Sequence, residues 1–250
     1  TYRGVFMRIK IKIEYDGTNF CGWQIQPNGR SVQEELELAT EKITGVRLKV
    51  TGSGRTDSGV HAEGQIAHFD TEATIPPERF AAALNAVLPG DVKVLESGEA
   101  ADDFNARFSA KRKTYRYKMY SSRFSHPLKD RYSVWIDHDL DCEKMNEAAA
   151  RFVGEHDFRC FLAADSDVES TVRTIYSATV ERRGEDIAFT VEGNGFLYNM
   201  VRIMAGTLLA VGEGKITIED VDKILEDKDR KFAGKTMPAR GLTLLNVFYE

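Results

Sequence analysis

Ile9-Lys-Ile-Lys-Ile-Glu-Tyr-Asp-Gly17 is the stretch of this 250-residue chain from which the fold prediction starts. Apolar and charged residues alternate through it, which is the period of a β-strand with one face buried and the other toward water. Asp16-Gly17 is a turn sequence and predicts the end of the strand. The chain therefore begins with a half-buried strand.

A predicted helix follows. Ser31 and Glu34 form a capping box, apolar residues recur at helical spacing, and Gly45 marks the end. The same patterns predict the other elements of the first half, which are a strand at 46–50, a glycine-rich loop at 51–64, a strand at 65–69, a helix starting at Pro76-Pro77 and a strand at 91–95. The order is β-α-β-β-α-β.

The second half repeats this order. Its predicted elements are a strand at 114–120, a helix at 141–153, a hairpin of 171–181 against 186–192, an apolar helix at 196–211, a short helix capped by Thr217 and a strand at 243–249. A β-α-β-β-α-β order is that of the ferredoxin-like unit. The sequence thus predicts an α+β fold of two tandem ferredoxin-like units, in an N-terminal α/β subdomain at 7–105 and a C-terminal α/β subdomain at 106–250.

Composition limits the cellular setting. The chain is 42% hydrophobic, carries a formal charge of −5 and has three cysteines without a Cys-x-x-Cys pair, which favours a globular protein of the reducing cytoplasm. Residues 1–10 lack the apolar core of a signal peptide. The longest apolar stretch, 196–211, is interrupted and too short for a bilayer, so we expect no membrane segment. The five histidines show no metal-ligand spacing, so no metal site is predicted.

The most unusual stretch is Thr51-Gly-Ser-Gly-Arg-Thr-Asp-Ser-Gly-Val-His-Ala62, in which three glycines surround Arg55 and Asp57. A dinucleotide fingerprint would need glycine at Asp57, and a P-loop would need Lys and Ser or Thr in place of Val60 and His61. One interpretation is a tight turn, since Asp followed closely by Gly is common in turns. The other is a ligand site, where glycines allow close approach and Arg55 keeps Asp57 ionised as a nucleophile or base.

A second candidate is the segment 107–131, which holds nine basic residues against one acidic residue, a local charge of +8. Tyr115, Tyr117, Tyr120 and Phe124 lie among them, and cations with aromatic faces suit RNA phosphates and unstacked bases. The alternative is a strand whose basic residues simply face water. Because strand side chains alternate, Tyr115 and Tyr117 share a face, and at least one tyrosine is expected in the core.

Arg202 is a charge inside the apolar stretch 196–211. A buried arginine without a partner is costly, so Arg202 is expected to meet a carboxylate. A purely structural ion pair, or a side chain whose charged end reaches solvent, remains an equal alternative.

The loop Gly54-Arg-Thr-Asp-Ser-Gly-Val-His-Ala62 closely resembles the signature of the tRNA pseudouridine synthase A family. Further matches occur in the order of that family along nearly the whole chain. They are Tyr15-Asp-Gly-Thr18, Gly22-Trp-Gln24, Val32-Gln-Glu34, Leu84-Asn85, Leu88-Pro89, Phe104-Asn-Ala-Arg107, Tyr115-Arg-Tyr117, Gly154-Glu-His-Asp-Phe158, the residues 196–202 and Gly241-Leu242.

The resemblance implies a site and a reaction. Asp57 corresponds to the catalytic aspartate, Tyr115 to the residue that contacts the target base, and Arg55 and Arg202 to arginines beside the aspartate. Family members act as homodimers on uridines 38 to 40 of the tRNA anticodon stem-loop, and each tRNA is bound across both subunits. Two positions depart from the family pattern: Ser58 stands where alanine is usual, and Thr243 where an aromatic residue is common.

The implied reaction, uridine to pseudouridine, transfers no electrons or groups, so no cofactor is expected. It needs an ionised carboxylate, which attacks the sugar, attacks the base or removes the C2′ proton. Two rival functions use the same motifs. A non-catalytic RNA-binding protein would need only the basic aromatic strand, and a glycoside hydrolase would need a second acid paired with Asp57.

Overall fold

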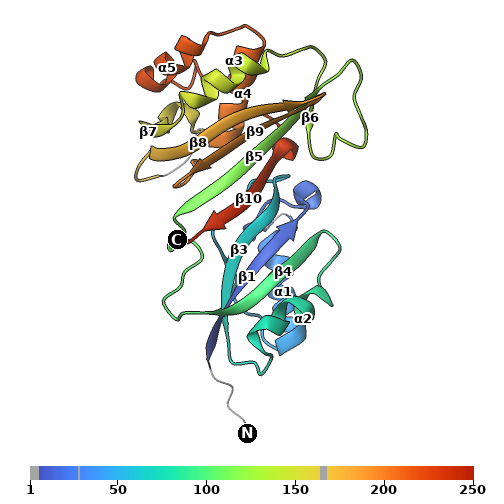
Figure 1. Ribbon diagram of the computed structural model, residues 1–250. Coiled ribbons are helices and arrows are strands. Elements are labelled where there is room, and N and C mark those ends of the chain that lie inside the picture. Colours follow the sequence, from blue (N-terminus) through green and yellow to red (C-terminus); the bar gives the residue numbers. More distant parts are fainter. Residues whose placement is uncertain (1–5, 28, 164–167) are drawn as a thin grey trace. The chain divides into compact units, whose positions relative to one another are not determined.

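The computed structural model describes residues 6–27, 29–163 and 168–250. Residues 1–5, which are half of the N-terminal stretch without a signal-peptide core, lie outside the described residues. The chain divides into two compact units (Figure 1). The first runs to Lys111 and includes Leu244–Glu250; the second is Arg112–Thr243. None of the helices in the described ranges is long and apolar enough to cross a membrane.

The first unit is built on the predicted strand, β1 (Met7–Tyr15). Its side chains alternate as expected, with Ile9, Ile11, Ile13 and Tyr15 buried. The strand order is β4-β1-β3-β10, and β1 is antiparallel to both neighbours. These strands are β3 (His61–Thr71), β4 (Val92–Ala100) and β10 (Leu242–Phe248), with the short β2 (Thr51–Gly52) paired to β3.

Two helices cover one face of these strands. In α1 (Val32–Thr44), Ser31 Oγ accepts from Glu34 N, and Gly45 ends the helix with a φ of 78°. The second helix is shorter than predicted, a 3-10 turn Pro77–Arg79 followed by α2 (Phe80–Asn85). The ring of Phe80 packs edge-on against Phe69 of β3, 5.4 Å between centroids. The apolar core of this unit lies between this helix layer and β1.

The predicted strand at 46–50 is wrong, because only β2 pairs with β3 in this region. The segment 46–50 lies beside α1 instead, and two side chains of α1 accept hydrogen bonds from the main chain of the segment. Leu48 N donates to Thr40 Oγ1, and Val50 N donates to Glu37 Oε1. These polar helix side chains replace a strand partner, and the apolar Val46 stays 59% exposed.

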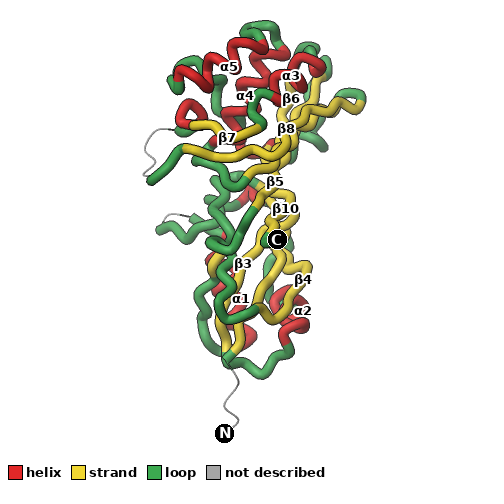
Figure 2. Tube along the Cα trace, turned by 60° about the vertical axis from the view of Figure 1, so that its left-hand side comes forward, coloured by secondary structure: helices red, strands yellow, loops and turns green. Residues whose placement is uncertain are grey.

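The second unit has a sheet layer and a helix layer (Figure 2). The strand order is β5-β9-β8-β7, and the short β6 is parallel to β5. The strands are β5 (Arg112–Ser121), β6 (Val134–Ile136), β7 (Gly154–Asp157), β8 (Val172–Arg183) and β9 (Asp186–Gly193). The helices are α3 (Cys142–Ala150), α4 (Met200–Gly212) and α5 (Ile218–Asp227).

Most predictions for this unit are confirmed. β8 and β9 form the hairpin, turning at Gly184 with a φ of 63°, and Thr217 caps α5 in a full capping box with Asp220. The apolar helix begins later than predicted, because Asn199 has a φ of 60°, which a right-handed helix cannot contain. Strands β6 and β7 were not predicted.

Candidate active site

Asp57 and Arg55 lie on the loop between β2 and β3, in the first unit. Val60 N donates to Asp57 O at 3.1 Å, and Gly59 has a φ of 80°, so the segment is a tight turn. Asp57 is partly exposed at this turn, and Arg55 is exposed. The two interpretations of the motif are therefore compatible, since a tight turn is what presents the carboxylate.

The segment after β1 supports this loop. Trp23 N donates to Thr56 O at 3.1 Å, and Phe20 O accepts from Ser58 Oγ and from Gly59 N at 3.2 and 3.3 Å. Ser58, where the family pattern has alanine, thus adds a hydrogen bond to the loop. Because these contacts lie on both sides of Asp57, the main chain is held before and after the carboxylate.

The loop also rests on buried polar side chains. Tyr15 Oη lies 2.8 Å from Thr56 Oγ1, and the Gln65 amide donates to Gly54 O at 3.0 Å. Tyr15, Thr56 and Gln65 are all less than a tenth exposed. Sequence reasoning missed both supports, because Tyr15 occupies an apolar position of β1 and Gln65 the start of a predicted strand.

The histidine of the motif, His61, makes a structural contact. His61 is buried, and its Nδ1 accepts from Gly17 N at 3.0 Å. Likewise, His68 Nδ1 accepts from Ala106 N at 3.2 Å. Residues 6–27, 29–163 and 168–250 contain no group of three or more His, Cys, Asp or Glu residues placed to hold a metal ion.

Tyr115 belongs to the second unit, in β5. It is 8% exposed, and its ring meets Phe196 edge-on at 5.2 Å between centroids and 81° between planes. Tyr117 on the same face is fully buried and donates to Pro238 O at 2.7 Å. The expectation that at least one tyrosine is core is confirmed, and Tyr115 is held by an aromatic neighbour.

Arg202 lies in the first turn of α4, also in the second unit. Its Nε donates to Met237 O at 2.7 Å and its Nη1 to Asn199 Oδ1 at 2.6 Å. Tyr117 donates to the carbonyl of Pro238, the residue after Met237; burial raises the pKa of Tyr117, while the charges of Arg202 and Arg240 act in the opposite direction. The segment Met237-Pro238 therefore ties Arg202 and Tyr117 together.

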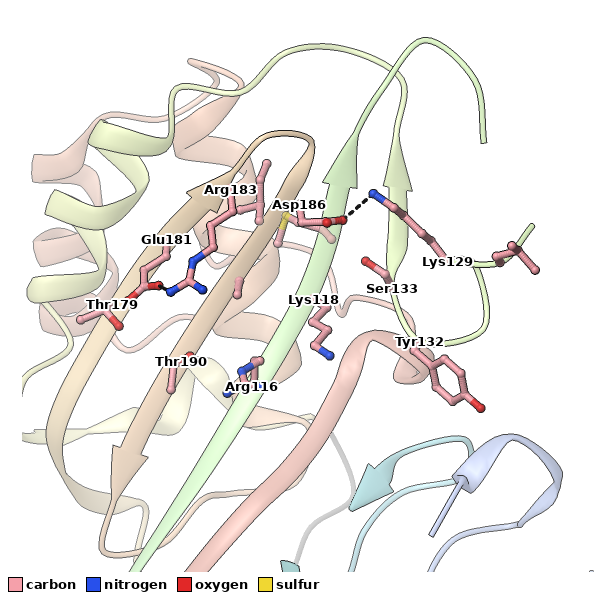
Figure 3. Close-up of a pocket in the computed structure, with 14 residues that line it drawn as sticks. Arg116, Lys118, Lys129, Tyr132, Ser133, Thr179, Glu181, Arg183, Asp186 and Thr190 are labelled. Carbon is pink, nitrogen blue, oxygen red and sulfur yellow. Dashed lines mark hydrogen bonds and ion pairs between the residues drawn. The ribbon is translucent and has the colours of Figure 1, made fainter. Parts of the chain in front are cut away.

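The face of the second unit turned away from the helices carries Arg116 and Lys118 of β5 (Figure 3). A pocket of about 690 Å³ lies there, and Arg116, Lys118, Lys129 and Arg183 contribute its positive charge. Lys129 is paired with Asp186 at 2.7 Å, and Arg183 with a carboxylate of β8 at 3.1 Å. As predicted, the strand alternation places Tyr115 and Tyr117 on the buried face of β5 and Arg116 and Lys118 on the other face.

Comparison with known proteins assigns the chain to a family. The sequence model described as tRNA pseudouridine synthase matches residues 11–109 and 148–250, which includes the Asp57 loop, α4 and β10. The chain belongs to the tRNA pseudouridine synthase family. It is therefore an isomerase, which excludes the non-catalytic RNA-binding protein and the glycoside hydrolase as the class of this chain.

Individual relatives agree with this family. The tRNA pseudouridine synthase A of Halalkalibacterium halodurans is 50% identical over 94% of this chain and 90% of its own length. That of Bacillus subtilis is 48% identical over 98% of this chain and 100% of its own. Among solved structures, a weak similarity that adds nothing to this assignment is to the crystal structure of the archaeal box H/ACA sRNP Nop10–Cbf5 complex, over 92% of this chain and 58% of that chain, at 15% identity and a TM-score of 0.37.

Proposed function

We propose that this pseudouridine synthase acts on uridines 38, 39 and 40 of the tRNA anticodon stem-loop, with Asp57 as its essential carboxylate. The observation that carries the assignment of Asp57 is its place as the first residue of a tight turn whose main chain is hydrogen-bonded on both sides of the carboxylate. A carboxylate that must meet one atom of a bound nucleotide needs such a fixed position.

The reaction breaks the N1–C1′ bond of uridine, turns the base while it is held, and joins C5 to C1′. The base first leaves its stack, and an aromatic ring can hold it once extruded. In this proposal Tyr115 supplies that ring, stiffened by Phe196. Arg55 and Arg202 keep the Asp57 carboxylate ionised, and Asp57 attacks the sugar, attacks the base or removes the C2′ proton.

The tRNA backbone would bind on the open face of the second unit. Lys118 and Arg116 project there beside the pocket, at neighbouring same-face positions of β5. RNA affinity comes mainly from such contacts with phosphates, which carry no sequence information. The overall charge of −5 is compatible with this because the basic residues are concentrated in one segment.

Three further features belong to this proposal. Each of the two units is ferredoxin-like. In the first unit, the strand order β4-β1-β3 and the pairing of β2 with β3 support this proposal. The protein acts in the cytoplasm, as its cysteine usage suggests. It acts as a homodimer with each tRNA bound across both subunits, as the family resemblance implies.

The test is tritium release from tRNA labelled at C5 of uridine, because C5 loses its hydrogen when it bonds to C1′. Asp57→Asn should release no tritium yet bind tRNA with an affinity close to that of the unaltered protein. Turnover by Asp57→Asn would overturn the assignment of the carboxylate. Release of free uracil by the unaltered protein would instead point to hydrolysis of the glycosidic bond.

A further inference from the structure

The side chain of Gln65 contacts the Asp57 loop at two points. Gln65 is fully buried within β3, at its fifth residue. Its Nε2 donates to Gly54 O at 3.0 Å, and its Oε1 accepts from Ser53 Oγ at 2.5 Å and from Ile66 N at 3.2 Å. One amide thus joins β3 to the two residues that precede Arg55.

Tyr15 continues this buried network to Thr56. Its hydroxyl lies 2.8 Å from Thr56 Oγ1. Burial raises the pKa of Tyr15 far above its usual value, while hydrogen bonds to Thr56 and Gln65 act in the opposite direction. The hydroxyl therefore stays neutral and keeps its proton for donation. Ser53, Gly54 and Thr56 are all bonded to these two side chains, and they flank Arg55 and lead into Asp57.

The buried hydrogen bonds of this network can fix the position of the Asp57 loop, because water has no access to take the place of a lost partner. Tyr15, Gln65, Ser53 and Thr56 are between 0 and 6% exposed. Removing one partner from a buried pair leaves the other without a hydrogen bond, and the main chain must move to recover one. A displacement of about 1 Å at a catalytic group can cost about 100-fold in rate.

We propose that Gln65 and Tyr15 are positioning residues for Asp57, which set the place of the carboxylate through the main chain of residues 53–56. This proposal rests on the proposed role of Asp57. Neither side chain needs to touch the tRNA. Their loss should therefore lower kcat and leave the KM for tRNA nearly unchanged, since phosphate contacts elsewhere supply most of the affinity.

The test compares Gln65→Leu with Asn85→Leu by kcat and KM, at a temperature where circular dichroism shows both variants folded. Asn85 is a matched control in the same unit, since its amide also makes two main-chain hydrogen bonds, to Val94 of β4. We expect Gln65→Leu to lose about 10- to 100-fold in kcat with KM within about two-fold, and Asn85→Leu to retain its kcat. An unchanged kcat in Gln65→Leu, or an equal loss in Asn85→Leu, overturns the proposal.

Gln65→Glu tests the same idea if Gln65→Leu does not fold. A neutral carboxyl can donate to Gly54 O, whereas an ionised carboxylate repels that oxygen, and burial favours the neutral form. The activity of Gln65→Glu should therefore fall with rising pH relative to that of the unaltered protein. A pH profile parallel to that of the unaltered protein overturns the proposal.

Tyr15→Phe should reduce kcat about ten-fold, because it keeps the ring but removes the bond to Thr56; an unchanged kcat would remove Tyr15 from the proposal. Asp57→Asn, assayed on the same tRNA, separates the two proposals. If Asp57→Asn is active, the role of Asp57 fails. If Asp57→Asn is inactive while Gln65 and Tyr15 variants have normal kcat, only the positioning role fails.

Discussion

Gly22 lies so close to Thr56 that a Cβ atom on Gly22 would stand 2.5 Å from the Thr56 carbonyl oxygen. Real Cβ atoms do not approach main-chain atoms this closely. Gly22 also has a φ of 108°, a region that side chains disfavour. The segment after β1 and the Asp57 loop are therefore packed main chain against main chain, which only glycine allows at this position.

Gly22→Ala should consequently shift the loop and lower the free energy of unfolding by about 3 kcal/mol, with at least a ten-fold loss of pseudouridine formation. Gly45→Ala is the matched control. Gly45 also has a positive φ, 78°, but its Cβ would meet nothing within 4 Å. It should cost about 1 kcal/mol and spare activity in the folded protein. Urea unfolding and the tritium assay measure both effects, and similar results for the two variants would refute the packing argument.

Tyr115→Phe tests the role of the aromatic ring. The Phe ring keeps the edge-on packing against Phe196, so we expect partial activity from this variant. Tyr115→Ala removes the ring and should lower the rate at least about ten-fold further. Single-turnover rates with saturating enzyme are the measurement. Equal rates for Phe and Ala would show that the ring itself contributes nothing.

The stability of the first unit should depend on pH through Asp91. Arg30 donates to both carboxylate oxygens of Asp91, at 2.7 and 3.0 Å, and this pairing lowers the Asp91 pKa. Because the folded pKa is below the unfolded value of about 3.9, the stabilisation is complete above that pH and is lost as the pH falls through the folded pKa.

Asp91→Asn should therefore destabilise the protein by about 1 kcal/mol near neutral pH, and the difference from the unaltered protein should shrink in acid. Urea unfolding from about pH 7 down to about pH 2.5 measures it. A difference that stays constant over this range would mean that the charge of Asp91 does not stabilise the fold.

Lys118→Ala tests the proposed RNA surface. Removing one phosphate contact should weaken tRNA binding and reduce the slope of log affinity against log salt by about 0.7 to 0.9. The matched control is Lys144→Ala, which removes the same charge from α3 in the helix layer. Binding curves at several salt concentrations distinguish them. An unchanged slope in Lys118→Ala, or the same change in Lys144→Ala, would contradict the assignment.

Strong local patterns predicted the elements that obey them. The alternation in β1 and the turn at Gly184 each involve neighbouring residues, so the sequence alone was sufficient for them. The segment 46–50 was wrongly predicted because its main-chain donors bind Thr40 and Glu37 of α1, and a single sequence does not reveal such contacts.

In the candidate site, too, the residues marked by a local motif could be predicted, whereas those that matter through distant contacts could not. Asp57 could be singled out because glycines and Arg55 are unusual together. Gln65, by contrast, owes its proposed role to its hydrogen bond with Gly54. The residues next to Gln65 in the sequence do not indicate that its side chain is buried against Gly54. Support for a catalytic loop is a property of the folded structure, whereas the residue types that suit the chemistry are visible in the motif.

In the proposed function, this chain forms pseudouridine at positions 38 to 40 of tRNA through Asp57. The most direct measurement is to map pseudouridines in tRNA from cells that lack the protein, then restore either the unaltered chain or Asp57→Asn. We predict that uridines remain at these positions in the deleted cells, that the unaltered chain converts them, and that Asp57→Asn does not. Pseudouridine that persists without the protein, or returns with Asp57→Asn, would contradict the claim.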